Sequence, residues 1–257
     1  MSNPARTILI TGAGSGLGRG MAIWLAKQGH SILVADLRFD AAQETAALIQ
    51  SEQGRAEAYQ LDVTSEEEIA KFMATLGDRA VDVVINNAGL QHVCSVEEFP
   101  VEKWDLLIKV LLKGPFLLTQ ATLPGMRARG FGRFIQIGSI HSLVASPYKS
   151  AYTAAKHALL GLSKVLALES AGAEITSNTI CPAYVRTPLV DAQIAAQAVT
   201  RGLPEEEVIE RIMLAPMPKK TFITVEEIAA AADYLISPLA RNVTGQTIVI
   251  DGGWTAQ

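Results

Sequence analysis

Residues 7–18 read T-I-L-I-T-G-A-G-S-G-L-G, an apolar, β-branched stretch followed by a turn rich in glycine. The pattern predicts a strand, a tight turn and then a helix over 17–28, which Gly29 ends. Glycines at 12, 16 and 18 allow a sharp turn and let a pyrophosphate approach the backbone. The helix N-terminus adds unpaired N–H donors and a positive dipole. Such a strand, turn and helix are typical of a dinucleotide-binding unit.

The same alternation of short apolar stretches and longer helical patterns continues along the chain. Helices are predicted at 41–52, from Thr64 or Ser65 onward, and around 151–171. The strands lack period-two alternation, which indicates burial on both faces, as in a parallel sheet covered by helices. We therefore expect a single α/β domain over 1–257, with a doubly wound seven-stranded parallel sheet of the Rossmann type. Beyond the first strand, the sheet is predicted from 31–35, 56–61, 81–86, 133–138, 174–180 and 247–250.

One stretch, 187–224, interrupts this alternation. It is helical in pattern but contains Pro204, Pro216 and Pro218, which break helices. We interpret it as a helical lid over the substrate site, because long insertions of this kind are usually functional. A peripheral helical decoration is the alternative.

Composition limits the possible partners. The chain has 257 residues, with 22 basic and 26 acidic side chains and a net charge of -4. No Lys/Arg cluster indicates a nucleic-acid partner. Cys94 and Cys181 lie far apart without metal-type spacing, so we expect free thiols in a reducing compartment and no metal site. Neither a signal peptide nor a run approaching about 18 apolar residues is evident, so we expect a cytoplasmic protein with no membrane partner.

Asp36 ends the second predicted strand. An acidic residue about 20 residues after the glycine-rich turn typically binds the adenosine ribose hydroxyls. A carboxylate there repels a 2′-phosphate, so NAD is favoured over NADP. Arg38 offers the opposite possibility, since its charge suits a 2′-phosphate. Asp62, after the third strand, is either an adenine contact or a turn aspartate.

Tyr152 and Lys156 stand four residues apart in S-A-Y-T-A-A-K. On a helix they share one face. A nearby ammonium favours the phenolate and lowers the phenol pKa, which gives an acid/base group for neutral pH. Taken alone, the pair also fits an ordinary solvated helix face. The glycine-rich turn, N-N-A-G at 86–89 and Ser139 favour the catalytic interpretation.

Together these motifs identify a family. T-G-A-G-S-G-L-G (11–18), L-D-V (61–63), N-N-A-G, Ser139, Y-T-A-A-K (152–156), C-P-A-Y-V-R-T-P (181–188) and D-G-G (251–253) resemble the short-chain dehydrogenase/reductase family over essentially the full chain. Within it, G-L-Q-H (89–92), G-S-I-H-S-L-V-A-S-P-Y-K-S-A-Y (138–152), C-P-A-Y-V-R-T-P-L-V (181–190) and D-G-G-W-T-A (251–256) are similar to the bacterial D-3-hydroxybutyrate dehydrogenases.

The resemblance implies a role for each matching residue. Tyr152 would exchange a proton with the substrate, Lys156 would lower its pKa and bind the nicotinamide ribose, and Ser139 would hydrogen-bond the substrate oxygen. Asn86 resembles a sheet-stabilising position. The implied cofactor-binding residues are Gly12, Ser15, Gly16, Leu17, Gly18, Asp36, Asp62, Val63, Asn87, Ala88, Gly89, Tyr152, Lys156, Pro182, Val185 and Thr187.

The narrower resemblance also implies a site for the substrate carboxylate. Its members, described in the family as two Gln, one His and one Lys, correspond here to Gln91, His141, Lys149 and Gln193. Tyr184 and Trp254 are candidate pocket walls, or simple packing residues. Charge-assisted hydrogen bonds to a carboxylate would fix which carbon faces the nicotinamide.

The expected activity is the NAD-dependent interconversion of (R)-3-hydroxybutyrate and acetoacetate by a homotetramer. The alternatives are the same chemistry on another small hydroxy acid, a secondary alcohol or a sugar, and a redox-sensing NAD-binding protein without turnover. Loss of Tyr152 or Lys156 would have favoured the last alternative, and both are present.

Two departures from the family pattern stand out. Many relatives carry an Asn, which supports a proton-relay water, where V-L-L-K-G-P-F (110–116) places Leu111. Pro182-Ala183 replaces the usual Pro-Gly.

Overall fold

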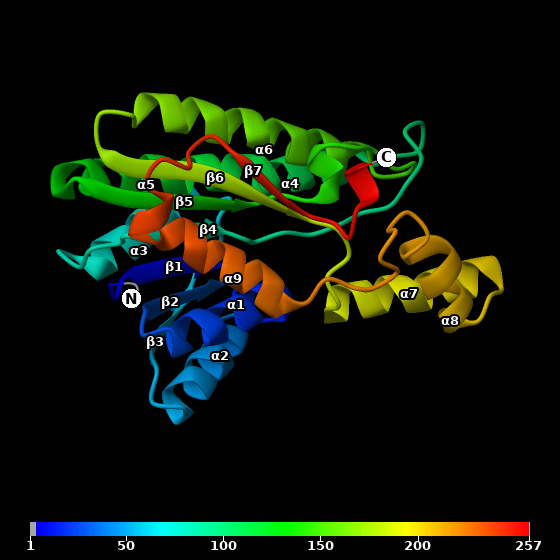
Figure 1. Cartoon of the computed structure of the whole chain (residues 1–257), viewed down its shortest axis with the longest axis horizontal. Helices are drawn as coiled ribbons and strands as arrows, with labels where there is room; N and C mark the ends of the chain where they lie inside the picture. Colours follow the sequence, from blue (N-terminus) through cyan, green and yellow to red (C-terminus); the bar gives the residue numbers. More distant parts are fainter. Residues whose placement is uncertain (1–3, 257) are drawn as a thin grey trace.

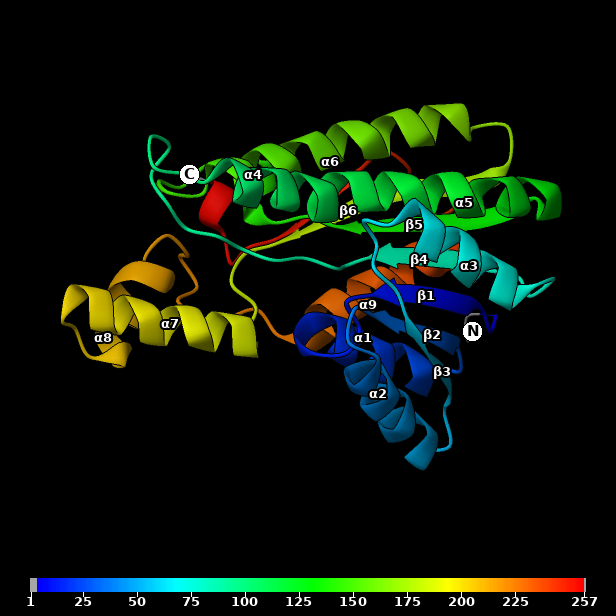
Figure 2. The same cartoon turned by 180° about the vertical axis from the view of Figure 1, so that it is seen from behind.

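The computed structural model describes residues 4–256, the side chains at positions 189, 192, 196 and 200 excepted. Its seven strands form one parallel sheet in the order β3-β2-β1-β4-β5-β6-β7 (Figures 1 and 2). The predicted fold is confirmed, with strand ends shifted by a residue or two. The strands are β1 (Thr7–Thr11), β2 (Ser31–Asp36), β3 (Arg55–Gln60), β4 (Val83–Asn86), β5 (Phe131–Ile137), β6 (Glu174–Pro182) and β7 (Thr247–Ile250).

Helices cover both faces of the sheet. On one face lie α1 (Gly16–Lys27), α2 (Phe39–Ser51) and α9 (Val225–Ile236), which pack on one another and on the strands. On the other lie α3 (Glu66–Leu76), α5 (Gly114–Arg129) and α6 (Ser150–Glu169) (Figure 2). The chain enters α5 through α4 (Val101–Ile108) and the π-helical turn η1 (Lys109–Lys113). Three single 3₁₀ turns complete the body: η2 (Ile140–Ser142), η4 (Pro238–Ala240) and η5 (Trp254–Ala256).

The inner strands bury both of their faces, as the continuous apolar runs predicted, whereas the edge strand β3 exposes Arg55, Glu57 and Gln60. Ile8 and Ile10 pack toward α1 and α9, whereas Leu9 between them packs with Val84 and Phe134 under α5. Successive side chains of a strand point to opposite faces, so one apolar run serves two cores. The two cores fix the sheet, and with it the carboxyl ends of β1, β4 and β5.

The helical stretch Val101–Arg129 corrects one expectation. By length and composition alone it is apolar enough to cross a membrane, although we expected no such run. Much of it packs inside the protein instead, with Leu107, Leu118 and Met126 fully buried, while Val101 and Phe116 are exposed. The stretch is a core helix that covers the sheet.

The stretch 187–224 contains α7 (Pro188–Arg201), α8 (Glu205–Val208) and the π turn η3 (Ile209–Met213). These helices lie to one side of the sheet (Figures 1 and 2) and share a small core of Val190, Ile194, Val208 and Met213. The two ends of the stretch lie side by side where the chain leaves and rejoins the rest of the protein. There the Ile223 N–H donates to the Tyr184 carbonyl at 2.9 Å.

Candidate active site

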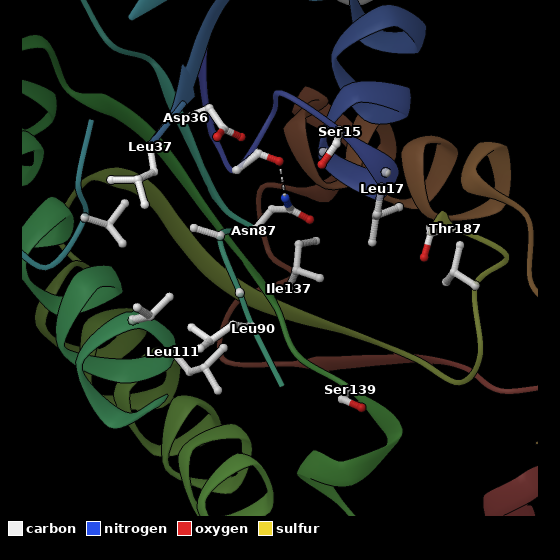
Figure 3. A pocket seen from close by; sticks show the side chains of 18 of the residues that line it. Ser15, Leu17, Asp36, Leu37, Asn87, Leu90, Leu111, Ile137, Ser139 and Thr187 are labelled. Atoms are coloured by element: carbon white, nitrogen blue, oxygen red, sulfur yellow. Dashed lines mark hydrogen bonds between the residues drawn. The ribbon is translucent and has the colours of Figure 1, made fainter. Parts of the chain in front are cut away.

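A cavity of about 620 Å³ opens at the carboxyl ends of β1, β4 and β5 (Figure 3). The strand order reverses between β1 and β4, and open α/β sheets bind ligands at such a switch point. Every residue to which the resemblance gave a cofactor contact lines this cavity, and so does Ser139. The cavity runs from Asp36 at the end of β2 to Tyr152 on α6.

Close packing explains one of the glycines in the turn. A Cβ added to Gly18 would lie 2.3 Å from the Gly12 carbonyl oxygen, so no larger residue fits. The Asn87 amide holds the same loop by donating to the carbonyls of Thr11 at 2.9 Å and Gly12 at 3.2 Å. Asn87 therefore fixes the glycine-rich turn against the end of β4 (Figure 3).

The turn also has the features that a dinucleotide needs. Gly16 has φ +52°, and a Cβ there would meet only the Thr187 side chain, 3.7 Å away, so the backbone faces open space. Ser15 precedes α1 without capping it through its side chain, which leaves the N–H groups of the first turn for an anion. The residues present thus fit a pyrophosphate.

Asp36 is held in place at the far end of this cavity. Its carboxylate accepts the backbone N–H groups of Gly14 at 2.8 Å and Arg38 at 3.0 Å. We did not single out Gly14 from the sequence, although a Cβ there would lie 2.8 Å from the Asp36 carboxylate. Asp62, after β3, is similarly fixed by the Thr64 N–H at 2.8 Å.

Sequence reasoning missed most of the apolar lining. These residues carry no chemical signature, and only their position at or after the strand ends or on α4, η1 and α7 could have indicated them. They are Leu37, Leu61, Leu90, Leu106, Val110, Ile137 and Val190.

The three predicted catalytic residues meet at the other end of the cavity. Ser139 follows β5 and begins η2, while Tyr152 and Lys156 lie one turn apart on α6. The Ser139 hydroxyl shares a hydrogen bond with the Tyr152 phenol. The Lys156 ammonium donates to the Ile137 carbonyl and lies 5.6 Å from the centre of the Tyr152 ring.

The electrostatics differ from the expectation. Burial raises the pKa of the Tyr152 phenol, and the hydrogen bond from Ser139 offsets only part of that shift. Burial also lowers the pKa of Lys156 to about 8. We expected Lys156 to lower the pKa of Tyr152, but desolvation is the larger effect here and the ammonium is bonded to the Ile137 carbonyl.

His141 and Lys149 form a polar pair beside the tyrosine. The Lys149 ammonium lies 3.2 Å from His141 Nε2 and over the Tyr184 ring at 5.6 Å. The His141 ring meets the rings of Tyr152 and Trp254 edge-on, at 6.3 and 6.0 Å between centres. Burial and the charge of Lys149 lower the pKa of His141 to about 4, so His141 is neutral near pH 7 and accepts from Lys149.

The two glutamines are not joined to this pair by any hydrogen bond among the described residues. Gln91 turns back on its own loop, where its side-chain oxygen accepts the His92 N–H at 3.0 Å. Gln193 is half-buried on α7, one helical turn after the cavity-lining Val190. The structure thus brings together His141 and Lys149, and leaves Gln91 and Gln193 on separate segments.

Leu111 lies on η1 in the wall of the cavity, near Leu90 (Figure 3). It is fully buried and packs with Leu107, Ala151 and Ala155 on the side of α6 that carries Tyr152. Single π turns in helices often mark functional sites. Here the turn presents an apolar side chain, so this part of the wall offers no polar side-chain atom to water.

Both cysteines are free thiols, as predicted. Within residues 4–256, no group of three or more His, Cys, Asp or Glu side chains is placed to hold a metal ion.

A dinucleotide cleft that ends at a Ser, Tyr and Lys trio defines an oxidoreductase that uses a nicotinamide dinucleotide on a small molecule. Comparison with known proteins agrees with this class. The family model described as enoyl-(acyl carrier protein) reductase matches residues 12–255. The chain belongs to the short-chain dehydrogenase/reductase family.

Several relatives span the whole chain. A D-beta-hydroxybutyrate dehydrogenase of Rhizobium meliloti is 46% identical and covers 98% of this chain and 99% of its own length. One from Cupriavidus necator is 42% identical and covers 98% of each. Among solved structures, a putative NAD(P)-dependent gluconate 5-dehydrogenase of Beutenbergia cavernae with bound NADP has a TM-score of 0.90 at 33% identity, over 99% of both chains.

Proposed function

We propose that this enzyme interconverts (R)-3-hydroxybutyrate and acetoacetate with NAD. The observation that carries the proposal is the Lys149 ammonium, held 3.2 Å from His141 Nε2 beside the proposed acid/base Tyr152. A positive group at that end of the site suits a short acid whose carboxylate lies near the reacting carbon. The dehydrogenases of the same substrate at 46% and 42% identity support it.

Tyr152, Ser139 and Lys156 perform the proton chemistry in this proposal. A bound nicotinamide dinucleotide supplies the hydride acceptor or donor. Because burial raises its pKa, Tyr152 keeps its proton at neutral pH and can give it to the carbonyl oxygen of acetoacetate. In the oxidative direction the Tyr152 oxygen takes the hydroxyl proton, and the nearby Lys156 charge stabilises the phenolate that must form first. Ser139 holds the substrate oxygen.

The carboxylate is bound by Lys149, with amide donors from Gln91 and Gln193. One Lys149 N–H points to His141 Nε2, which leaves two N–H groups for the substrate. Tyr184 and Trp254, whose rings lie 6.0 Å apart, close the remaining side. Attachment at the carboxylate and at the oxygen near Tyr152, together with hydride transfer on the one side where the nicotinamide would lie, selects one configuration at the hydroxyl carbon.

The choice of NAD over NADP rests on Asp36. Its carboxylate is fixed by two backbone N–H groups where the adenosine ribose would lie, and it would repel a 2′-phosphate. Arg38 also lines this end but is exposed. We weigh the fixed carboxylate above the exposed guanidinium.

Three further properties belong to the proposal. Residues 187–224 act as a lid, because Val190 and Thr187 line the cavity while α7 has a small core of its own. The enzyme is a cytoplasmic homotetramer. Exposed apolar residues on the outer helix faces support subunit contacts, among them Phe116 on α5 and Val165 and Leu168 on α6.

The test is NAD reduction with a panel of acids of both configurations. We expect (R)-3-hydroxybutyrate to give the highest kcat/KM, its (S) enantiomer to be a poor substrate, and NADP to be used less well than NAD. The panel includes gluconate and longer 3-hydroxy acids, because a structural neighbour is described as a gluconate 5-dehydrogenase. Preference for a sugar acid, or no turnover of 3-hydroxybutyrate, would overturn the substrate assignment.

A further inference from the structure

Tyr148, directly before Lys149, has an unusual backbone conformation. Its φ is +67°, a left-handed value that glycine adopts freely and a bulky residue rarely does. Pro147 precedes it, and Pro followed by a residue of positive φ is the arrangement of a type II turn, whose second central position normally carries Gly or Asn. A tyrosine in this position is disfavoured, so other contacts must hold it there.

Backbone contacts, and not burial of the ring, hold the turn. The Tyr148 carbonyl accepts the Cys94 N–H at 2.9 Å, and Cys94 pairs with Lys149 in an isolated parallel bridge. Tyr148 is 58% exposed, so packing of the ring contributes little. The strained turn thus depends on its link to the loop that follows β4.

This link joins the loops that carry two of the proposed carboxylate ligands, Lys149 and Gln91. Lys149 follows the turn immediately, and Gln91 lies on the same loop as Cys94. From this position the Lys149 ammonium lies 3.2 Å from His141 Nε2, and burial lowers the pKa of Lys149. A change of the turn therefore moves a charge at the substrate end of the site.

We propose that Tyr148 is a positioning residue that holds the Lys149 ammonium at the substrate carboxylate. The inference rests on the proposed function. The left-handed region open to a tyrosine is narrow, whereas glycine occupies a much wider range of φ and ψ. Once the Cys94 hydrogen bond places residue 148 in that region, tyrosine restricts the turn to one geometry. Substrate selectivity is thus supported by a conformation that is locally unfavourable.

The test replaces Tyr148 with glycine, which removes the strain and widens the turn. We expect KM for (R)-3-hydroxybutyrate to rise about 3- to 10-fold, because small misplacements of a binding group weaken productive contacts. We expect kcat and NADH affinity to stay within about twofold, and Tm to remain the same or rise, since glycine fits this φ. KM for the uncharged methyl ester should not change.

Two variants serve as controls. Tyr148→Asn keeps a side chain that tolerates left-handed backbone, and its KM should stay nearer to that of the unaltered enzyme than to that of Tyr148→Gly. Gln53→Gly makes the same kind of change at another non-glycine residue of positive φ, +62°, in the turn after α2. This variant should leave KM for acid and ester unchanged.

A second readout does not depend on the substrate. The rate at which an amine-specific reagent modifies Lys149 is followed by mass spectrometry, with NADH present. We expect Tyr148→Gly to raise that rate several-fold, even if the unaltered enzyme proves to prefer another acid. An unchanged labelling rate, equal losses for acid and ester, or an asparagine variant as impaired as the glycine variant would each overturn the proposal.

Discussion

The two ends of the cavity are held in different ways. At the cofactor end, side chains bond directly to the backbone: Asp36 accepts the Gly14 N–H at 2.8 Å, and Asn87 donates to the Thr11 carbonyl at 2.9 Å. At the substrate end, the Lys149 and His141 side chains bond to each other at 3.2 Å, and Gln91 and Gln193 approach from other segments. The first end is tied to the sheet, and the second is assembled from separate loops, η2 and α7.

This difference indicates which property of the enzyme substitutions at each end can change. A site bonded to the backbone of a buried sheet changes little unless the fold changes, which suits a cofactor shared by a whole family. A site made of long side chains on separate segments outside the sheet can change its ligand by single substitutions. We therefore expect substitutions at the substrate end to affect selectivity, and those at the cofactor end to affect dinucleotide affinity.

The largest effect on turnover is expected at the proposed acid/base, at the substrate end of the cavity. Tyr152→Phe removes the proton donor and keeps the ring, so kcat should fall by about 10²- to 10⁴-fold. NADH affinity should hardly change, because the rest of the cavity is intact. Stopped-flow binding and steady-state rates measured on one preparation separate the two quantities. Residual activity within tenfold of the unaltered enzyme would place the acid elsewhere.

Lys149→Ala tests the substrate end alone, because it should change kcat/KM for the acid without changing cofactor binding. A charge-assisted hydrogen bond contributes about 1.5–3 kcal/mol, so kcat/KM for 3-hydroxybutyrate should fall about 10- to 100-fold. The methyl ester lacks the charge and should be a poor substrate that is nearly indifferent to the substitution. Acid and ester, measured in both proteins, form a double-mutant cycle. Equal losses for both compounds would make the lysine structural.

Asp36→Ser probes the cofactor end. We expect the unaltered enzyme to prefer NAD over NADP at least about tenfold, which corresponds to roughly 1.4 kcal/mol, and the variant to narrow that ratio. Asp40→Ser removes the same charge from an exposed position in the first turn of α2 and is the matched control. Use of NADP as good as that of NAD by the unaltered protein contradicts this assignment.

The contrast between the ends also explains how much the sequence could predict. Glycine spacing and Asp36 answer local needs of the backbone, so the strand, turn and helix at 7–18 were predictable without long-range information. His141 and Lys149 come together only through a non-repetitive loop and η2, so the resemblance alone indicated them. The positive φ of Tyr148 has no local signal, because Pro-Tyr is compatible with an ordinary type I turn.

The pKa of Tyr152 shows a second limit of sequence reasoning. The spacing of Tyr152 and Lys156 predicts one helix face, which is correct. It does not predict that the ammonium bonds to the Ile137 carbonyl on β5, or that burial outweighs its charge at the phenol. Both depend on how α6 packs on the sheet, which no local pattern encodes.

A smaller effect, on the stability of the fold, is expected from the protonation of His141 as the pH falls. Its pKa in the fold is about 4, below the ordinary value of 6.5, so the unfolded chain binds more protons between these values. The stability associated with neutral His141 is complete above about pH 6.5 and is lost as the pH falls toward 4, by at most about 1.4 kcal/mol per pH unit. Thermal unfolding across this range measures it.

His141→Gln should flatten that part of the stability profile, because glutamine does not titrate. The exposed His157 on α6 provides the matched control. Its charge is the smallest of the causes that shift the pKa of His141, so His157→Gln should change the slope between pH 4 and 6.5 only slightly. A profile for His141→Gln as steep as that of the unaltered protein would show that other groups cause the loss.

The smallest effect is expected at Leu111, where the two ends share a wall. Leu111 is buried against Ala151 and Ala155 and lies 3.3 Å from a Cβ added to Gly89, so it forms an apolar wall of the cavity between α6 and the loop after β4. We expect the unaltered enzyme to turn over, with water reaching Lys156 by another route. Leu111→Asn places a polar amide in an apolar contact, so we expect some loss of Tm and a change in kcat of no more than a few-fold. Steady-state rates and thermal unfolding of both proteins test this. If the unaltered protein is inactive with NAD and 3-hydroxybutyrate while Leu111→Asn is active, the proton path requires that amide, and the enzyme is not competent as it stands.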